Sequence, residues 1–290
     1  MSTVRALYVY PVKSCGAIAL QRAQFDASGL QWDRHWMVAD ATGRFVSQRE
    51  YAAMARIVPE FVEEGVRLSM DGMSETLLLP FAPRGGETRV QASVWKDTFE
   101  ALDEGERAAQ WFTQALGVPV RLLRFARDVT RLASKKWTHD EDAPTQFADG
   151  YPILVTSESS LAELNARLAA KGAPPVPMSR FRPNIVVDDV NDAFDEDFVD
   201  TLAIESASGA QDIVLRFVKP CARCPITTID QQSGKRDANW PAEPLDTLAA
   251  FRADARVDGG LTFGQNAIVV TGAGERVAVG ARAEWEYRFE

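Results

Sequence analysis

The segment 219–230, KPCARCPITTID, places two thiols three positions apart, with Arg223 directly before the second. A thiol beside a guanidinium is held partly as thiolate, the form that attacks electrophiles and binds soft metals. Cys221 and Cys224 therefore allow three kinds of chemistry: a redox pair, half of a zinc site, or one cysteine ligand to a metal. In a fourth interpretation both cysteines are small buried hydrophobes at a strand end.

The residues around the thiols weigh against three of these interpretations without excluding them. A thioredoxin-like pair opens a helix, whereas this segment is predicted to be strand, tight loop and strand, with 226–229 in the second strand. A structural zinc site needs four ligands; there is no second Cys-x-x-Cys, and the available set is Cys15, Cys221, Cys224 and His35. If both cysteines were inert and buried, the presence of Arg223 between them would be unexplained, because a buried guanidinium needs an anionic partner.

Cations also stand at the ends of other predicted strands. Lys13 and Ser14 follow the first strand, in a turn whose hydroxyl and backbone N–H groups could bind a phosphate. Arg34 lies between tryptophans and Arg182 precedes an apolar strand. Each could instead pair with a carboxylate or stay in solvent. Together with Arg223 they suit an enclosed site for a phosphorylated ligand.

A hydroxyl-rich turn precedes the helix predicted after residue 157. Thr156 and Ser157 stand where free N–H groups and the helix dipole favour an anion. Taken alone, ordinary helix capping is the better explanation for them, and Ser160 with Glu163 is predicted to form a capping box. His35 is predicted to be a packed, hydrogen-bonded residue, and the sequence offers no pair of nucleophile and base.

Composition limits the class of protein. The chain has 290 residues, 46% hydrophobic and 25% charged, as is typical of a folded soluble protein. Its 32 basic and 41 acidic side chains give a net charge of -9, which argues against nucleic acid as a partner. No apolar stretch approaches the roughly 18 residues of a membrane span, and the first residues lack the features of a signal peptide. We therefore expect a cytoplasmic protein with no membrane span.

Short strands and few helices dominate the predicted elements. Helical spacing of apolar residues predicts helices over 105–117 and 160–172, and a third is expected over 243–253. The polar segment 127–150 is predicted to be a loop or boundary, and 263–288 a hairpin around the turn GAGE. Because no β-α-β rhythm is present, the chain is predicted to be mainly β with helices, an α+β fold built on barrels or sandwiches.

An ordered set of motifs identifies a family. YPVKSC, GLxxDRHW, SVWKDTFEALDEG, RFRPNIVV, PCARC followed by TTID, and FGQN occur in this order over residues 4–280. This set resembles the MOSC-domain proteins with an N-terminal β-barrel extension, a group that includes the mitochondrial amidoxime reducing components and bacterial relatives. The resemblance implies an N-terminal β-barrel-like domain over 1–126 and a MOSC β-barrel with peripheral helices over 127–290.

The resemblance also implies a cofactor. Proteins of this group bind the molybdenum cofactor, a pterin dithiolene with a terminal phosphate, and the molybdenum takes one protein cysteine. By its place in the motif that ligand is Cys224, with Cys221 as a neighbour. The residues implied to bind the pterin and its phosphate are Lys13, Ser14, Arg34, Arg182, Asn184 and Arg223, with Thr156 and Ser157 closing the site and Asn266 where some relatives carry a tyrosine.

The implied activity is reduction of N-hydroxylated compounds, namely amidoximes, hydroxylamines and N-hydroxylated bases, at this cofactor. The alternative is a non-catalytic carrier of the cofactor, or of a sulfur atom on Cys224. Since no cysteine follows Cys224, the chain is not expected to hold an all-cysteine iron–sulfur cluster like those of some bacterial relatives. A separate electron-donor protein of flavin, iron–sulfur or haem type is therefore expected.

Overall fold

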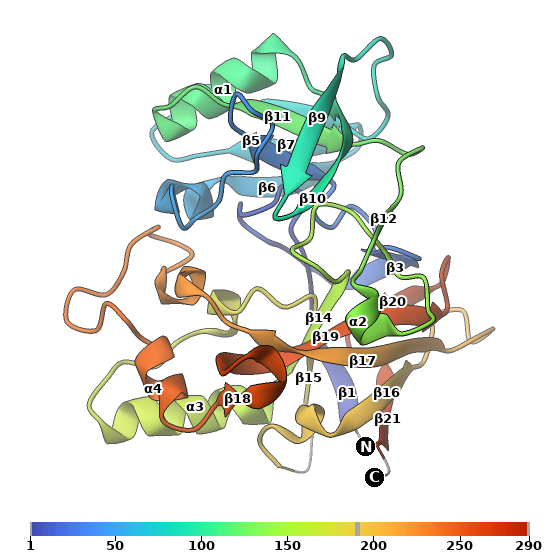
Figure 1. Ribbon diagram of the computed structural model, residues 1–290, viewed down its shortest axis with the longest axis vertical. Helices are drawn as coiled ribbons and strands as arrows, with labels where there is room; N and C mark the ends of the chain where they lie inside the picture. The colour runs from blue at the N-terminus through green and yellow to red at the C-terminus, as the bar shows by residue number, and fades with distance from the viewer. Residues whose placement is uncertain (1, 189–191, 289–290) are drawn as a thin grey trace.

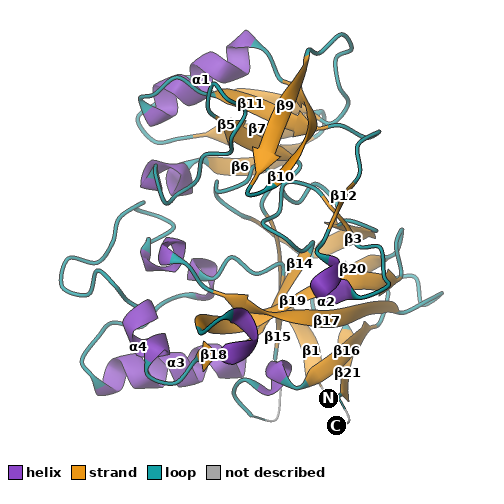
Figure 2. Ribbon diagram, in the orientation of Figure 1, coloured by secondary structure: helices purple, strands orange, loops and turns teal. Residues whose placement is uncertain are grey.

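The computed structural model describes residues 2–188 and 192–288 and arranges them in two lobes, one above the other in Figure 1. Strands make up most of both lobes, and helices lie at their outside (Figure 2). The predicted class, mainly β with peripheral helices, is confirmed.

The lower lobe is a closed barrel of seven strands. In spatial order these are β14 (Ile153–Ser157), β15 (Ile185–Val187), β1 (Ser2–Val9), β21 (Arg282–Tyr287), β16 (Val199–Ile204), β17 (Ile213–Ala222) and β19 (Gly260–Thr271). Pairing of β19 with β14 closes the ring, so no barrel strand keeps a free edge. Only β14 and β15 run parallel among these neighbours. Alternate side chains such as Val4, Val155, Leu202 and Phe217 fill the interior.

Four further strands extend this lobe. They are β2 (Ile18–Leu20), which pairs with β1, and β3 (Arg22–Asp26), which pairs with both β4 (Gly29–Leu30) and β20 (Arg276–Ala278). The hairpin predicted over 263–288 is therefore wrong. The chain does turn at Gly272, whose carbonyl accepts from Glu275 N at 3.0 Å. However, β20 then pairs with β3, which buries Val277 beside Ala23 and Phe25.

The upper lobe contains two sheets and a helix. One sheet has the order β5 (Trp36–Ala39), β11 (Arg121–Phe125), β10 (Asp97–Asp103), β9 (Arg89–Val94), and the other β6 (Val58–Val62), β7 (Gly65–Ser69), β8 (Leu77–Pro80). Helix α1 (Glu106–Leu116) places Trp111 and Phe112 in a core with Trp36, Leu68 and Leu122, so the helix and both sheets share one apolar interior.

The predicted helices are present, with changed bounds. Helix α1 is followed by its C-cap residue, Gly117, which has a left-handed φ of 72°. Helix α3 (Glu158–Ala170) begins earlier than predicted, because Ser157 is its N-cap and accepts from Ser160 N at 3.2 Å. The predicted capping box of Ser160 and Glu163 is therefore wrong, and Glu163 instead pairs with Arg167. The third predicted helix is the shorter α4 (Leu245–Ala249).

Short elements complete the described chain: η1 (Ala52–Arg56), β12 (Arg131–Leu132), α2 (Lys135–Thr138), β13 (Pro144–Thr145), η2 (Met178–Arg180), η3 (Asp195–Asp197), η4 (Pro225–Thr228), β18 (Ala253–Asp254) and η5 (Ala255–Val257). The predicted boundary near residue 126 stays a prediction, and the first strand, β1, lies in the barrel of the lower lobe. Of the helices in residues 2–188 and 192–288, none combines the length and apolar character that a membrane span requires.

Candidate functional site

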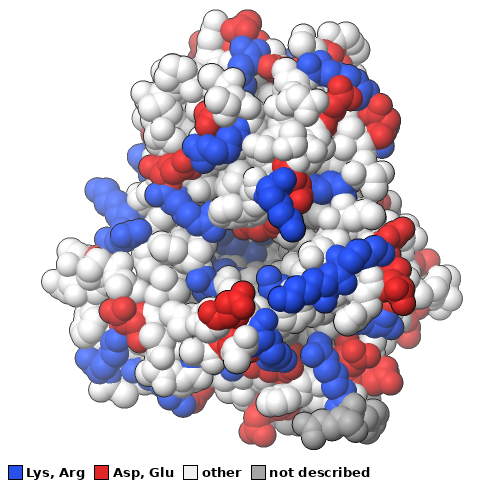
Figure 3. All heavy atoms as spheres, in the orientation of Figure 1, with Lys and Arg blue, Asp and Glu red and all other residues white. Residues whose placement is uncertain are grey.

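One cavity brings together eight of the ten predicted site residues. It has a volume of about 140 Å³ and is lined by Lys13, Ser14, Arg34, Arg182, Asn184, Arg223, Cys224 and Asn266. In Figure 3 the surface is hollowed between the two lobes, and Lys and Arg side chains gather there. Among the described residues that line the cavity four are cationic and one, Asp149, is anionic. Such an excess of positive charge favours an anionic ligand.

Two of the cations have carboxylate partners. Lys13 is almost fully buried, and its Nζ donates to the Phe147 carbonyl at 2.8 Å and to Asp149 Oδ1 at 2.6 Å. Burial lowers the pKa of the Lys13 ammonium, and the Asp149 carboxylate partly offsets that effect. Arg34 Nη1 pairs with Asp33 Oδ2. Both cations are therefore fixed in place, with most of their donors committed to protein groups.

The other two cations lack carboxylate partners in the described chain. Arg182 Nη1 donates to Gln231 Oε1 at 3.0 Å, and desolvation lowers the pKa of this guanidinium to about 10. Arg223 Nη2 donates to the Phe181 carbonyl at 2.6 Å, while its buried Nε has no hydrogen-bond partner. Both side chains are half-buried, and a guanidinium partly withdrawn from water without a counter-charge is costly. An anion bound in the cavity would remove that cost.

Tyr10 and Asn184 hold the arginines in position. The guanidinium carbons of Arg34 and Arg182 lie 4.3 Å and 4.2 Å from the centre of the Tyr10 ring, a cation–π geometry for both. Asn184 Oδ1 accepts from Arg34 Nη1 and from Leu154 N, each at 3.1 Å, and its Nδ2 donates to the Tyr8 carbonyl. Because these bonds use most of its capacity, Asn184 is suited to positioning Arg34 rather than to binding a ligand directly.

Backbone strain is concentrated in the same residues. Ser14, Arg34 and Arg182 have φ values of 67°, 47° and 56°, in the left-handed region that side chains with a Cβ avoid. Each such conformation costs about 1–3 kcal/mol and is typical of functional sites, where surrounding structure imposes it. The strain places these side chains at the cavity.

The two cysteines differ in their surroundings. Arg223 Nη1 donates to Cys221 Sγ at 2.9 Å. Its position directly before Cys224 in the sequence had suggested a contact with Cys224 instead. Cys224 Sγ has no hydrogen-bond partner within the described residues, is partly exposed, and lines the cavity. Its sulfur is open to an incoming ligand or metal.

The strand predicted for 226–229 is wrong. Residues Pro225–Thr228 form the 3₁₀ turn η4, with proline at its first position. Thr228 Oγ1 donates to the Pro225 carbonyl at 2.7 Å and Thr227 Oγ1 to the Cys224 carbonyl at 3.0 Å. Hydroxyls that bond back to the main chain in this way compete with strand pairing. Cys224 therefore stands at a sharp corner between β17 and η4.

A four-ligand zinc site is not assembled in the described part of the chain. No group of three His, Cys, Asp or Glu side chains there could hold a metal ion. Cys15 is fully buried, and burial raises the pKa of its thiol to about 12, so it stays protonated. His35 Nδ1 lies 2.8 Å from Gln146 Oε1, in agreement with the prediction that it is a packed, hydrogen-bonded residue.

Thr156 and Ser157 do not line the cavity. Both are fully buried in the barrel wall, where Thr156 Oγ1 donates to Met178 Sδ at 3.3 Å. Ser157 Oγ caps α3 and donates to Glu196 Oε2 at 3.0 Å. These side chains are committed to the local structure, and the structure does not bring them to the other predicted site residues.

Glu196 makes folding stability depend on pH. Burial raises the pKa of this carboxyl from 4.5 to about 7, against the hydrogen bonds from Ser160 and Ser157 that favour its charged form. Since the folded state holds the proton of Glu196 more tightly than the unfolded state, the contribution of Glu196 to the free energy of unfolding should fall as pH rises from about 4.5 to 7, by on the order of 2–3 kcal/mol. His35, whose pKa is lowered by burial, contributes in the opposite direction, so the effect of Glu196 is read as a difference between variants.

Urea unfolding of Glu196→Gln measures this effect. Relative to the unmodified protein, the free energy of unfolding of the variant should rise by that amount between pH 4.5 and 7. Glu286→Gln, at a more exposed carboxyl that accepts from Thr201 Oγ1, is the matched control and should show no such change relative to the unmodified protein. Parallel pH profiles for the protein and Glu196→Gln would contradict the assignment.

Sequence reasoning missed several residues of the site. Asp149 lies in the segment taken as a boundary, and nothing local separates it from the chain's many other carboxylates. Trp95 is 54% exposed with φ 56°, and its Nε1 donates to Asp149 Oδ1 at 3.1 Å. Tyr10 adjoins Lys13 within YPVKSC, so an aromatic residue beside clustered cations was an available signal.

Comparison with known proteins defines the class. Residues 1–119 match the MOSC N-terminal beta barrel domain, and residues 142–284 match the MOSC domain. The chain belongs to the family of MOSC-domain proteins with an N-terminal MOSC β-barrel domain, as the motifs predicted.

Within that family the chain is similar to named relatives. Mitochondrial amidoxime reducing component 2 of Bos taurus is 31% identical over 259 residues, 87% of this chain and 73% of that protein. Mitochondrial amidoxime-reducing component 1 of Homo sapiens is 33% identical over 263 residues, 87% and 72% of the two chains. Molybdenum cofactor sulfurase of Bos taurus is 31% identical over 249 residues, 80% of this chain and 27% of that protein.

Proposed function

We propose that this chain binds the molybdenum cofactor through Cys224 and reduces N-hydroxylated compounds with electrons from a separate donor protein. The observation that carries the proposal is the cavity itself, in which an open cysteine sulfur stands among four cations and one carboxylate. The names of the amidoxime reducing relatives support the reaction class, and the name of the sulfurase supports the cofactor.

The residues present fit a pterin dithiolene with a terminal phosphate. Such a group brings its own two sulfur ligands, so one protein thiolate completes a soft donor set. Its phosphate needs donors that are not already neutralised, and Arg182 and the buried Nε of Arg223 meet that need. Lys13, Ser14 and Arg34 would hold the remaining polar edge. Asn266 Nδ2 donates to the Lys219 carbonyl at 3.2 Å, which leaves its Oδ1 to accept from the ligand.

Reduction of an amidoxime consumes two electrons and two protons and gives an amidine and water. The cofactor supplies this two-electron chemistry when bound. The protein's part is to bind and orient: strained Ser14, Arg34 and Arg182 are fixed before the ligand arrives, so little ordering is needed on binding. The donor protein and the cytoplasmic location remain predictions.

Turnover of benzamidoxime with dithionite-reduced viologen tests the proposal on protein expressed with an intact cofactor pathway. We expect reduction by the unmodified protein and a loss of about 100-fold or more in kcat/KM for Cys224→Ser, since a metal ligand is removed. Cys221→Ser, one step from the metal, should lose about tenfold or less. A carrier would contain the pterin and yet show no turnover, and that result would reject the reductase in favour of the carrier.

A further inference from the structure

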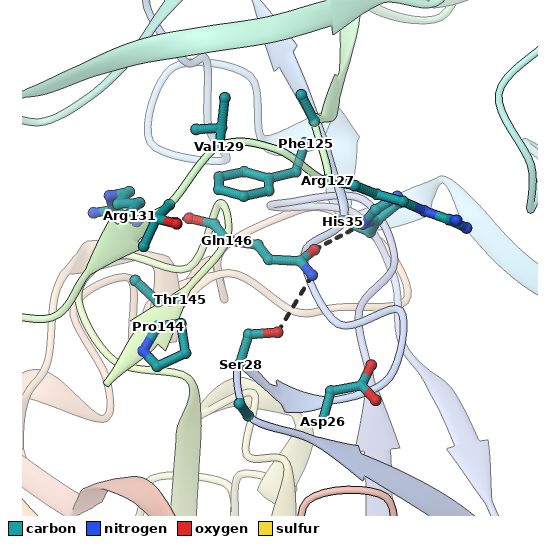
Figure 4. Close-up of a pocket in the computed structure, with 13 residues that line it drawn as sticks. Asp26, Ser28, His35, Phe125, Arg127, Val129, Arg131, Pro144, Thr145 and Gln146 are labelled. Atoms are coloured by element: carbon teal, nitrogen blue, oxygen red, sulfur yellow. Dashed lines mark hydrogen bonds between the residues drawn. The ribbon is translucent and has the colours of Figure 1, made fainter. Parts of the chain in front are cut away.

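A second cavity contains none of the ten predicted site residues. Its volume is about 360 Å³. Figure 4 shows its polar lining, which comes from the turn after β3, from His35, and from the segments beside β12 and β13. Phe125, Val129 and Pro144 add an apolar wall. Apart from Thr130 and Arg131, the polar groups are Asp26, Ser28, His35, Arg127, Thr145 and Gln146.

Three of these polar groups have no partner within the described chain. Thr145 is 2% exposed, and its buried Oγ1 makes no hydrogen bond. The half-buried Asp26 carboxylate and the exposed Arg127 guanidinium form neither a hydrogen bond nor an ion pair among the described residues, and burial raises the pKa of Asp26. Buried polar groups are nearly always satisfied in folded proteins, so an orphaned hydroxyl at a cavity points to a missing ligand group.

The other polar groups are neutral and fixed. Desolvation lowers the pKa of His35 to about 4, so its imidazole is uncharged at neutral pH. Gln146 Oε1 accepts from Nδ1, which leaves Nε2 of the ring as an acceptor, and Gln146 Nε2 points to Ser28 Oγ at 3.4 Å (Figure 4). The lining therefore offers one open anion, one open cation, neutral hydrogen-bonding groups and an aromatic ring.

Arg131 also lines the cavity, but its donors are used. Its Nε pairs with Asp97 at 2.9 Å, and its Nη1 and Nη2 donate to the carbonyls of Gln146, Ala148 and Asp149. Arg127 is therefore the guanidinium left for a ligand. In Figure 4 Arg127 lies above the Gln146 amide group and Asp26 below it.

We propose that this cavity binds a small zwitterion of the α-amino-acid type. The ligand's ammonium would pair with Asp26, its carboxylate with Arg127, and its side chain would pack on Phe125 and Val129. A simple anion would be repelled by the open Asp26 carboxylate, and a simple cation by Arg127, whereas a zwitterion satisfies both charges. Thr145 would donate to or accept from the same ligand. This assignment does not depend on the cofactor or on the reductase activity.

The two cavities share a segment of the chain. Gln146 lines the second cavity and Asp149 the first, and the carbonyls between them are held by Arg131 and by Lys13. His35 follows Arg34 directly, and Phe147 N donates to the Arg34 carbonyl at 3.1 Å.

Ligand-observed NMR on the full chain tests the assignment. The twenty standard amino acids are screened at millimolar concentration, and the strongest binder is compared with the amine that lacks its carboxylate and the acid that lacks its amine. We expect at least one amino acid to bind, and both one-charge analogues to bind about tenfold or more weakly.

Two variants place the site. Asp26→Asn and Thr145→Val should each weaken binding about tenfold, while Asp71→Asn, at an exposed carboxyl of the upper lobe, should not. Thr145→Val should fold at least as stably as the unmodified chain, because the lost hydroxyl has no partner. The proposal is overturned if no amino acid binds, if the amine alone binds equally well, or if Asp26→Asn and Thr145→Val leave binding unchanged.

Discussion

Arg182→Met is expected to lower retention of the cofactor about tenfold or more, and to raise the stability of the cofactor-free protein by about 1–2 kcal/mol. Arg182 is held in a left-handed conformation, its pKa is lowered to about 10 by desolvation, and the nearby Arg34 repels it. Methionine fills a similar volume without a charge. The variant should therefore relieve an apo-state cost that the bound anion normally removes.

Two measurements on the same preparations decide this prediction. Pterin and phosphate content after gel filtration measures retention, and urea unfolding of cofactor-free protein measures stability. Arg107→Met, at an exposed arginine of α1, is the matched control and should change neither. A variant that retains the cofactor normally, or that is destabilised without it, would show that Arg182 serves the fold and not the ligand.

Glu104→Ala is expected to destabilise the protein by about 3–5 kcal/mol, because it leaves a buried charge unpaired. Arg124 Nε donates to Glu104 Oε1 at 2.6 Å, with both side chains almost completely buried, and Trp36 Nε1 donates to the same oxygen at 2.7 Å. Arg124 also donates to the carbonyls of Pro80 and Phe81 and so joins the two sheets of the upper lobe.

Urea unfolding followed by tryptophan fluorescence measures the loss. Glu106→Ala, which removes the exposed partner of Arg121, is the control and should cost less than about 1 kcal/mol. Adding Arg124→Met to Glu104→Ala should recover part of the stability, since the unpaired guanidinium is then absent. If Glu104→Ala costs no more than Glu106→Ala, the buried pair does not stabilise the upper lobe as described.

Local patterns in the sequence predicted the features that depend on near neighbours. The apolar spacing of Ala108, Trp111 and Phe112 predicted α1, and the alternation of short strands predicted a mainly β fold. The ordered motifs predicted which residues gather around Cys224, because motif order carries tertiary information that no single segment contains. Eight of the ten named residues line one cavity, although their roles there remain predictions.

Features that depend on distant partners could not be predicted in this way. Pairing of β20 with β3 joins residues about 250 positions apart, and the turn at Gly272 looks identical whether or not its strands pair with each other. Even between near neighbours the sequence left a choice open, since Arg223 is next to Cys224 but donates to Cys221 Sγ. Ser157 matched an anion-binding turn, yet Glu196, 39 residues later, occupies its hydroxyl.

The content of molybdenum and pterin in purified protein tests the central claim most directly. Unmodified protein and Cys221→Ser, expressed with an intact cofactor pathway, should contain both in near-equal molar amounts, and Cys224→Ser should keep about a tenth of the molybdenum or less. Stoichiometric zinc without molybdenum in the unmodified protein, or loss of the metal from Cys221→Ser but not from Cys224→Ser, would contradict the assignment of Cys224 as the metal ligand.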